Sequence, residues 1–112
     1  KVSEEWIASL PENDWRQHKR DHPVASLLYP PKKSHFLRLI DQLKVIAAKS
    51  GHTISQLAVA WALRFPEVTA AIVGARRKGQ IAETVKATEW RLNQDELASV
   101  ESACAKLRLA IN

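Results

Sequence analysis

The fold is decided by residues 53–84, which read TISQLAVAWALRFPEVTAAIVGARRKGQIAET. Thr53 and Gln56 are spaced as a capping box, in which the two side chains satisfy free backbone amides at the start of a helix. The residues that follow are apolar on nearly every side of that helix, and Pro66 stops it. The sequence therefore predicts a helix that is buried on more than one side.

Residues 68–73, VTAAIV, come next and are typical of a short strand that Gly74 ends. The run is apolar without alternation, as in a parallel strand that helices cover on both faces. The backbone groups of such a strand must pair with a neighbouring strand. Because the sequence offers no second convincing strand, we expect the partner strands to lie outside these 112 residues.

Long amphipathic helices are predicted on both sides of this stretch. The first spans about residues 33–49, where apolar residues recur at helical spacing. Gly51 suits the left-handed conformation in which helices commonly end. The last helix begins at a second capping box, formed by Asn93 and Glu96.

A shorter helix over about residues 78–87 is expected to bury Ile81 and Val85. The chain then divides into two parts. Residues 1–32 form a loop-rich lead-in with a short helix, and residues 33–112 run helix, helix, strand, helix, helix. The predicted fold class is therefore mostly α with one short strand.

The composition is that of an ordinary globular protein, with 46% hydrophobic residues and a net charge of +5. The longest apolar run, residues 57–63, is far too short to span a bilayer. A single cysteine, Cys104, excludes an internal disulfide and fits the reducing cytoplasm, where we expect the protein to reside. The first residue is Lys1 rather than Met, which fits a sequence that begins within a longer gene product or after processing.

Positive charge gathers in two places. One cluster contains Arg16, Lys19 and Arg20, and its role cannot be told from the sequence. The other covers residues 76–78. Nucleic-acid binding is the less favoured interpretation, because no RNA-binding pattern of aromatic and basic residues and no zinc-finger spacing accompanies these clusters.

The second cluster lies in residues 74–79, here called the basic turn, between the predicted strand and the next helix. A helix start presents free amides to a phosphate, and Arg76 and Arg77 add full charge and bidentate donors. Gln80 and Glu83 are close enough along a helix to share one side, where they can hydrogen-bond a base or a ribose. Ligands of α/β proteins also lie at the carboxyl ends of strands. The alternative interpretation is a solvated helix start without a ligand.

The sequence also resembles a known family, in four runs: TISQLAVAWAL at 53–63, VTAAIVGAR at 68–76, QIAE at 80–83 and LNQDEL at 92–97. These runs are similar to the C-terminal part of aldo-keto reductases. The resemblance is closest to members related to potassium-channel β-subunits and to bacterial general-stress reductases. It covers about residues 33–107 and is most specific over 53–83.

The resemblance implies that the chain is the C-terminal portion of a (β/α)8 TIM barrel of the NADP-dependent oxidoreductase type. In that family the turn after the eighth strand holds the adenosine end of NADPH. The positions of this sequence that match the family's contacts to that end are Gly74, Ala75, Arg76, Gln80, Glu83 and Thr84. The resemblance makes Arg76 the ligand of the 2′-phosphate and puts Gln80 and Glu83 at the adenine and ribose. Thr84 departs from the family's usual asparagine, which weakens the adenine contact.

Hydride transfer in this family uses a set of Tyr, Lys, Asp and His residues. These residues come from earlier strands of the barrel, which the 112 residues do not include. We therefore expect no catalytic residue here, with Tyr29 and the four histidines in ordinary roles. The implied cofactor is NADP at a partial site. The expected partners are NADPH once the barrel is completed, and self-association or a complementing chain; no membrane is expected. A stand-alone small helical binding or assembly module is the alternative.

Overall fold

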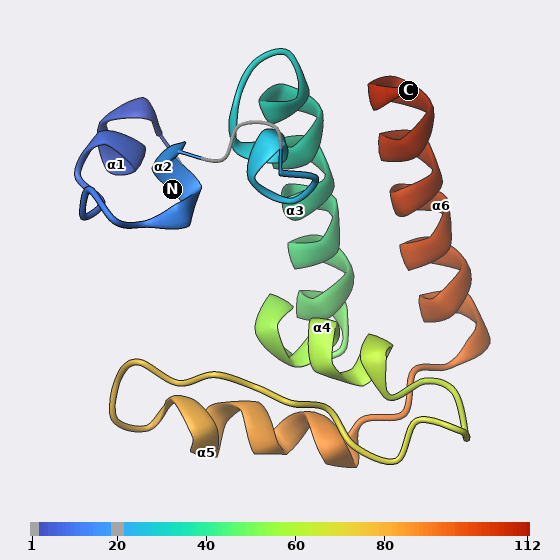
Figure 1. The fold of residues 1–112 in the computed structure, drawn as a ribbon. Helices are drawn as coiled ribbons and strands as arrows, with labels where there is room; N and C mark the ends of the chain where they lie inside the picture. The colour runs from blue at the N-terminus through green and yellow to red at the C-terminus, as the bar shows by residue number, and fades with distance from the viewer. Residues whose placement is uncertain (1–2, 19–21) are drawn as a thin grey trace.

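A computed structural model describes residues 3–18 and 22–112 of the chain, and its described part is helical (Figure 1). Lys19 and Arg20 of the first basic cluster lie outside these residues. The elements in chain order are α1 (Glu4–Ala8), α2 (Trp15–His18), the 3-10 helix η1 (Ala25–Leu28), α3 (Lys32–Lys49), α4 (Ile54–Ala62), α5 (Gln80–Val85), the 3-10 helix η2 (Lys86–Glu89) and α6 (Gln94–Ile111).

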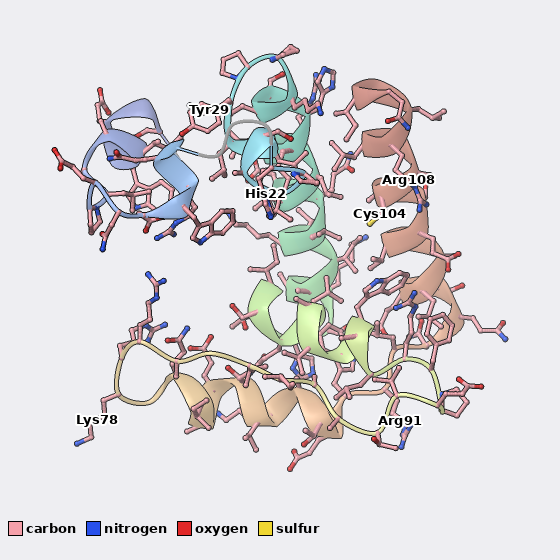
Figure 2. The ribbon with its side chains drawn as sticks, in the orientation of Figure 1. His22, Tyr29, Lys78, Arg91, Cys104 and Arg108 are labelled. Carbon is pink, nitrogen blue, oxygen red and sulfur yellow. The ribbon has the colours of Figure 1, made fainter. Side chains whose placement is uncertain are left out.

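The centre of the fold is the pair of long helices α3 and α6, which run side by side in opposite directions (Figure 1). Helix α4 packs across the C-terminal end of α3. The buried core where they meet consists of Ala47, Leu57 and Val100. Cys104 is half-buried against this core, on the side of α6 that faces α3 in Figure 2. The core is small, and half-buried side chains surround it.

Both predicted capping boxes are confirmed. At the start of α4 the Gln56 amide donates to the Thr53 hydroxyl over 3.3 Å, and the Thr53 amide donates to Gln56 Oε1 over 3.0 Å. At the start of α6 the Asn93 and Glu96 pair makes the same two bonds, at 2.8 and 2.9 Å. Gly51 has a φ of 73°, so the predicted left-handed end of α3 is also confirmed.

The prediction that the helix after Thr53 is buried on more than one side is wrong. Leu57 and Ala60 are buried, whereas Ala58 and Ala62 are exposed. Helix α4 therefore buries one face against the rest of the fold. No described element covers its other face, which includes Ala58 and Ala62.

The predicted strand at 68–73 is not seen. Residues 68–76 run without regular secondary structure, and the Ile72 side chain is fully exposed. A strand is defined by hydrogen bonds to a neighbouring strand, and no described segment provides one. The helix after the basic turn also begins later than expected, at Gln80, and leaves Ile81 and Val85 exposed rather than buried.

The lead-in folds into short helices that pack on each other and on the start of α3. Ser3 caps α1 by accepting a hydrogen bond from the Trp6 amide at 3.0 Å. The Gln17 side chain of α2 donates to the Ile7 and Leu10 carbonyls, which ties α2 to α1. The Tyr29 hydroxyl lies 2.6 Å from the Arg16 carbonyl, and this contact joins η1 to α2.

Candidate functional site

The basic turn is an exposed loop that leads directly into α5. Every residue from Ile72 to Gly79 is exposed, and Lys78 projects outward from the loop in Figure 2. Gly79 has a φ of 84°, in the left-handed region that favours glycine, and it ends the turn where α5 begins. The left-handed conformation of Gly79 was not predicted, although a glycine just before a helix is a signal for such a turn. Arg76, Arg77 and Lys78 are thus presented together on the turn that leads into α5.

The polar side chains of α5 are turned toward the basic turn itself. Gln80 Oε1 accepts a hydrogen bond from the Arg76 amide at 2.9 Å. Glu83 Oε2 lies 3.6 Å from the Arg77 guanidinium, an ion pair whose partners are largely solvated. The structure therefore brings Arg76, Arg77, Gln80 and Glu83 together, whereas the helical spacing predicted only that Gln80 and Glu83 share one side of the helix.

Thr84 and Gly74 differ from these four residues in their surroundings. Thr84 is buried, and its hydroxyl donates to the Gln80 carbonyl of the same helix at 2.7 Å. That hydroxyl is therefore engaged within α5. Gly74 and Ala75 are exposed, and a side chain at Gly74 would meet no atom within 4 Å. The Gly74 backbone is thus open to an approaching ligand.

The net charge of the site favours an anion. Arg76 and Lys78 form no ion pair with a described residue, whereas Arg77 is paired with Glu83. One carboxylate therefore faces three cations, and an excess of two positive charges remains. A phosphate monoester carries about −1.5 to −2 near pH 7, so the donor set fits such a group.

The lead-in contributes a carboxylate at some distance. Asp14 accepts hydrogen bonds from the Arg16 amide and guanidinium, at 3.0 and 2.8 Å. These bonds are the main reason that the pKa of Asp14 lies well below its usual range. The positive charge of Arg76 lowers that pKa further, by a smaller amount. Arg76 therefore lies within electrostatic reach of the lead-in.

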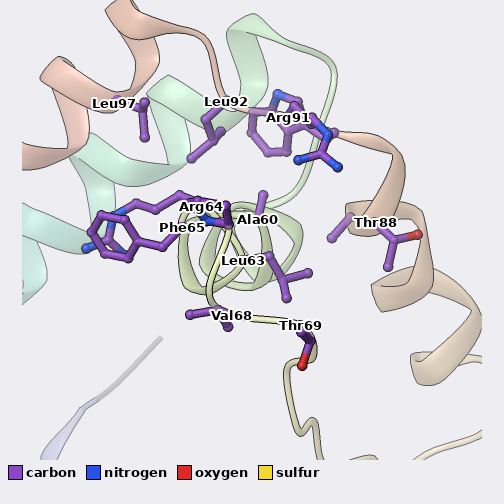
Figure 3. Close-up of a pocket in the computed structure, with 13 residues that line it drawn as sticks. Ala60, Leu63, Arg64, Phe65, Val68, Thr69, Thr88, Arg91, Leu92 and Leu97 are labelled. Carbon is purple, nitrogen blue, oxygen red and sulfur yellow. The ribbon is translucent and has the colours of Figure 1, made fainter.

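A second candidate site is a groove of about 610 Å³ at the other end of α5, beside Arg91 (Figures 2 and 3). Leu63, Leu92 and Leu97 are among its apolar lining residues. The Arg64 guanidinium is 3.9 Å from the centre of the Trp61 ring and 4.0 Å from that of Phe65. No acidic residue lines the groove. It is nevertheless a weaker candidate for anion binding than the basic turn, because the Arg64 guanidinium already stacks on these rings and donates to the Trp61 carbonyl.

Tyr29, His22 and His52 make ring or hydrogen-bond contacts within the fold, and the exposed His35 lies within hydrogen-bond distance of Arg38. The Tyr29 hydroxyl contacts backbone carbonyls, and His52 stacks on Trp90 with ring centres 4.1 Å apart. Trp15 meets the edge of His22 at 5.2 Å. Within residues 3–18 and 22–112, no group of three His, Cys, Asp or Glu side chains is arranged to hold a metal ion. None of the helices described is both long and apolar enough to cross a bilayer.

Comparison with known proteins assigns the family. The model of the aldo/keto reductase family matches residues 7–105, so this chain belongs to that family. The match includes much of the lead-in, which lies outside the resemblance over residues 33–107.

Several curated proteins are similar to the chain over part of their length. A putative voltage-gated potassium channel subunit beta of Schizosaccharomyces pombe is 42% identical over 67 residues, 60% of this chain and 20% of that protein. A probable subunit beta of Arabidopsis thaliana is 45% identical over 53 residues, 47% of this chain and 16% of that protein. L-glyceraldehyde 3-phosphate reductase of Escherichia coli O157:H7 is 29% identical over 101 residues, 89% of this chain and 29% of that protein. The chain thus aligns with less than a third of each relative, and no solved structure matches it.

Proposed function

We propose that this chain supplies the adenosine 2′-phosphate-binding turn of an NADPH-dependent aldo-keto reductase. The observation that carries the proposal is the charge of the basic turn, where Arg76 and Lys78 are exposed and without a carboxylate partner among the described residues. Charge-assisted hydrogen bonds from a guanidinium to a phosphate are among the stronger ones in proteins. Membership of the aldo/keto reductase family supports NADPH as the source of that phosphate.

Within this proposal each residue of the site has a role. Arg76 binds the 2′-phosphate, and the exposed Gly74 and Ala75 backbone lets the cofactor approach closely. Gln80 and Glu83 exchange their present partners for the ribose and adenine, while Thr84 supports the helix from inside. When bound, NADPH supplies the hydride that reduces a carbonyl. The residues named here hold only its adenosine end.

The proposed architecture is part of a (β/α)8 barrel. Residues 33–112 are its C-terminal segment, and residues 1–32 are a loop-rich lead-in. Residues 68–73 become a strand when a neighbouring strand is supplied, because their mostly apolar side chains suit a buried sheet. The chain is not catalytic on its own in this proposal, since the reacting end of the cofactor lies beyond the turn.

Titration with 2′,5′-ADP tests the proposed site. Losing a hydrogen bond to a charged group costs about 1.5–3 kcal/mol, so Arg76→Ala should bind roughly ten- to hundredfold more weakly. Arg108→Ala is the matched control, because Arg108 is an exposed arginine on α6, away from the basic turn (Figure 2). ADP without the 2′-phosphate should bind both variants alike. Equal binding of 2′,5′-ADP to the parent chain and Arg76→Ala would show that the site is misassigned.

A second candidate function is that of a binding or assembly module. The supporting observation is the exposure of large apolar side chains on one stretch of the chain, at Ile72, Ile81 and Val85. Apolar surface of this kind favours association with a second chain. This function is compatible with the first, because a complementing chain would also complete the barrel.

A further inference from the structure

The junction of α4 and α5 contains the two buried polar side chains of the described residues, Gln56 and Thr84, which are 5% and 9% exposed. Buried polar atoms must be hydrogen-bonded, and both side-chain polar atoms of Gln56 have a partner. Its Oε1 accepts from the Thr53 amide at 3.0 Å, and its Nε2 donates to the Glu83 carbonyl at 2.9 Å. One amide side chain thus joins the start of α4 to the backbone of α5, 27 positions further along the chain.

Helix α5 depends on contacts of this kind. It has only six residues, and helices this short are not stable by themselves in water. Its apolar residues Ile81 and Val85 are exposed and contribute little packing. Among the described residues, the bond from Gln56 is the only hydrogen bond that a side chain of another helix makes to α5, so it helps to fix the position of α5 beside the buried Thr84.

The position of α5 in turn determines that of the basic turn. Gln80 Oε1 holds the Arg76 amide at 2.9 Å, and Glu83 pairs with Arg77. Both contacts start from α5, and the turn is otherwise an exposed loop. A movement of α5 therefore displaces the two arginines.

We infer that Gln56 is a positioning residue for the anion-binding turn, acting through its hydrogen bond to the Glu83 carbonyl and not through contact with the ligand. The inference rests on the proposed function for its effect on nucleotide binding. Its structural step, the fixing of α5, stands on the geometry alone. The two residues of the capping box therefore differ in role, because Thr53 stabilises α4 but has no bond to α5.

Gln56→Glu tests this role with little change of shape, because a carboxylate can still accept from the Thr53 amide but cannot donate to the Glu83 carbonyl. Gln56→Met removes the donor without adding a charge, and serves if the acidic variant does not fold. Thr53→Ala is the matched control: it removes the other half of the same capping box and leaves the Gln56 to Glu83 bond in place.

Residue-resolved hydrogen exchange of the whole chain is the first measurement. We expect the protection of the amides of residues 80–85 to fall about tenfold in both Gln56 variants, with α6 unchanged. Thr53→Ala should loosen the first turn of α4 only. A uniform loss over all helices would mean a general stability role, and it would overturn the inference, as would unchanged protection of α5.

Titration with 2′,5′-ADP is the second measurement. The loss of one neutral hydrogen bond corresponds to about a three- to tenfold weaker affinity, which we expect in the Gln56 variants and not in Thr53→Ala. If the parent chain does not bind, the proposed function fails, and hydrogen exchange still decides whether Gln56 fixes α5. If the parent binds and the Gln56 variants match it in affinity, the inference fails and the proposed function remains.

Discussion

Leu57→Ala is the substitution for which the structure predicts the largest loss of stability. Leu57 is 2% exposed and is the largest fully buried side chain of the core it shares with Ala47 and Val100. The substitution removes three carbon atoms, worth about 2.4 kcal/mol of transfer free energy at about 0.8 kcal/mol each. A cavity adds to this cost. Because half-buried neighbours surround this small core and can move inward, we expect a total of about 2.5–3 kcal/mol.

Leu109→Ala is the matched control, because it changes the same side chain where it is 84% exposed near the end of α6. About one-sixth of the transfer term is at stake there, roughly 0.4 kcal/mol, and the higher helix propensity of alanine offsets part of it. The two variants therefore differ in burial and not in chemistry.

Urea unfolding followed by far-ultraviolet circular dichroism measures both changes. We expect Leu57→Ala to lower the midpoint without changing the slope, and to lower Tm by about 10 °C for a chain of this size. Domains of this length are stable by about 6–17 kcal/mol, and a small core suggests the lower end, so this one change removes a third or more of the stability. If Leu57→Ala costs under 1 kcal/mol, or no more than Leu109→Ala, the packing described here is wrong.

The remaining predictions concern acid stability, association and activity. Partial burial alone would raise the pKa of Glu96, but hydrogen bonds from Ser50, from the Asn93 amide and from the Trp90 indole lower it. The stability that Glu96 contributes is therefore present above its unfolded pKa of about 4.3 and is lost as the pH falls through the lower folded value. Glu96→Gln should reduce the change in the free energy of unfolding over that pH range. An unchanged pH dependence would contradict this role of Glu96. Ile72→Lys should reduce self-association in sedimentation without changing the melting curve, and a monomeric parent chain would refute the assembly function. The chain with NADPH should reduce no aldehyde in an assay that follows the absorbance of the cofactor, because the proposed site holds only the adenosine end of the cofactor and not the end where the carbonyl needs a proton donor. Turnover that survives repurification and disappears on changing a residue of this chain would refute that expectation.

Features of the fold that depend on neighbours in sequence were predictable. The capping boxes at Thr53 and Asn93 and the left-handed Gly51 each follow from residues within three or four positions of one another, so the sequence specifies them directly. The same is true of the amphipathic helix α3, which spans Lys32–Lys49. Helical spacing also predicts that Gln80 and Glu83 share one side of α5, but not that this side faces the arginines of the turn.

Features that depend on distant segments were not predictable. The bond from Gln56 to the Glu83 carbonyl joins residues 27 positions apart, and nothing in either local pattern indicates it. The strand at 68–73 failed for the opposite reason: its composition is right, but a strand exists only with a partner. Burial of Ile81 and Val85 was predicted from helical periodicity, which shows that a face is apolar and not that another element covers it.

The same stretch of chain, residues 68–85, contains both the proposed anion-binding turn and the exposed apolar side chains of Ile72, Ile81 and Val85. Because the two features share one stretch of chain, we expect nucleotide affinity to depend on whether another element or chain covers the apolar side chains. If the binding-competent turn is only a fraction of the population, the apparent Kd exceeds the intrinsic Kd by the inverse of that fraction. Anything that covers Ile72 or Val85 should then tighten binding without touching the ligand. A weak parent affinity is therefore expected of this chain, and the informative quantity is the ratio between matched variants: Arg76→Ala removes a ligand contact, whereas Gln56→Glu lowers the competent fraction.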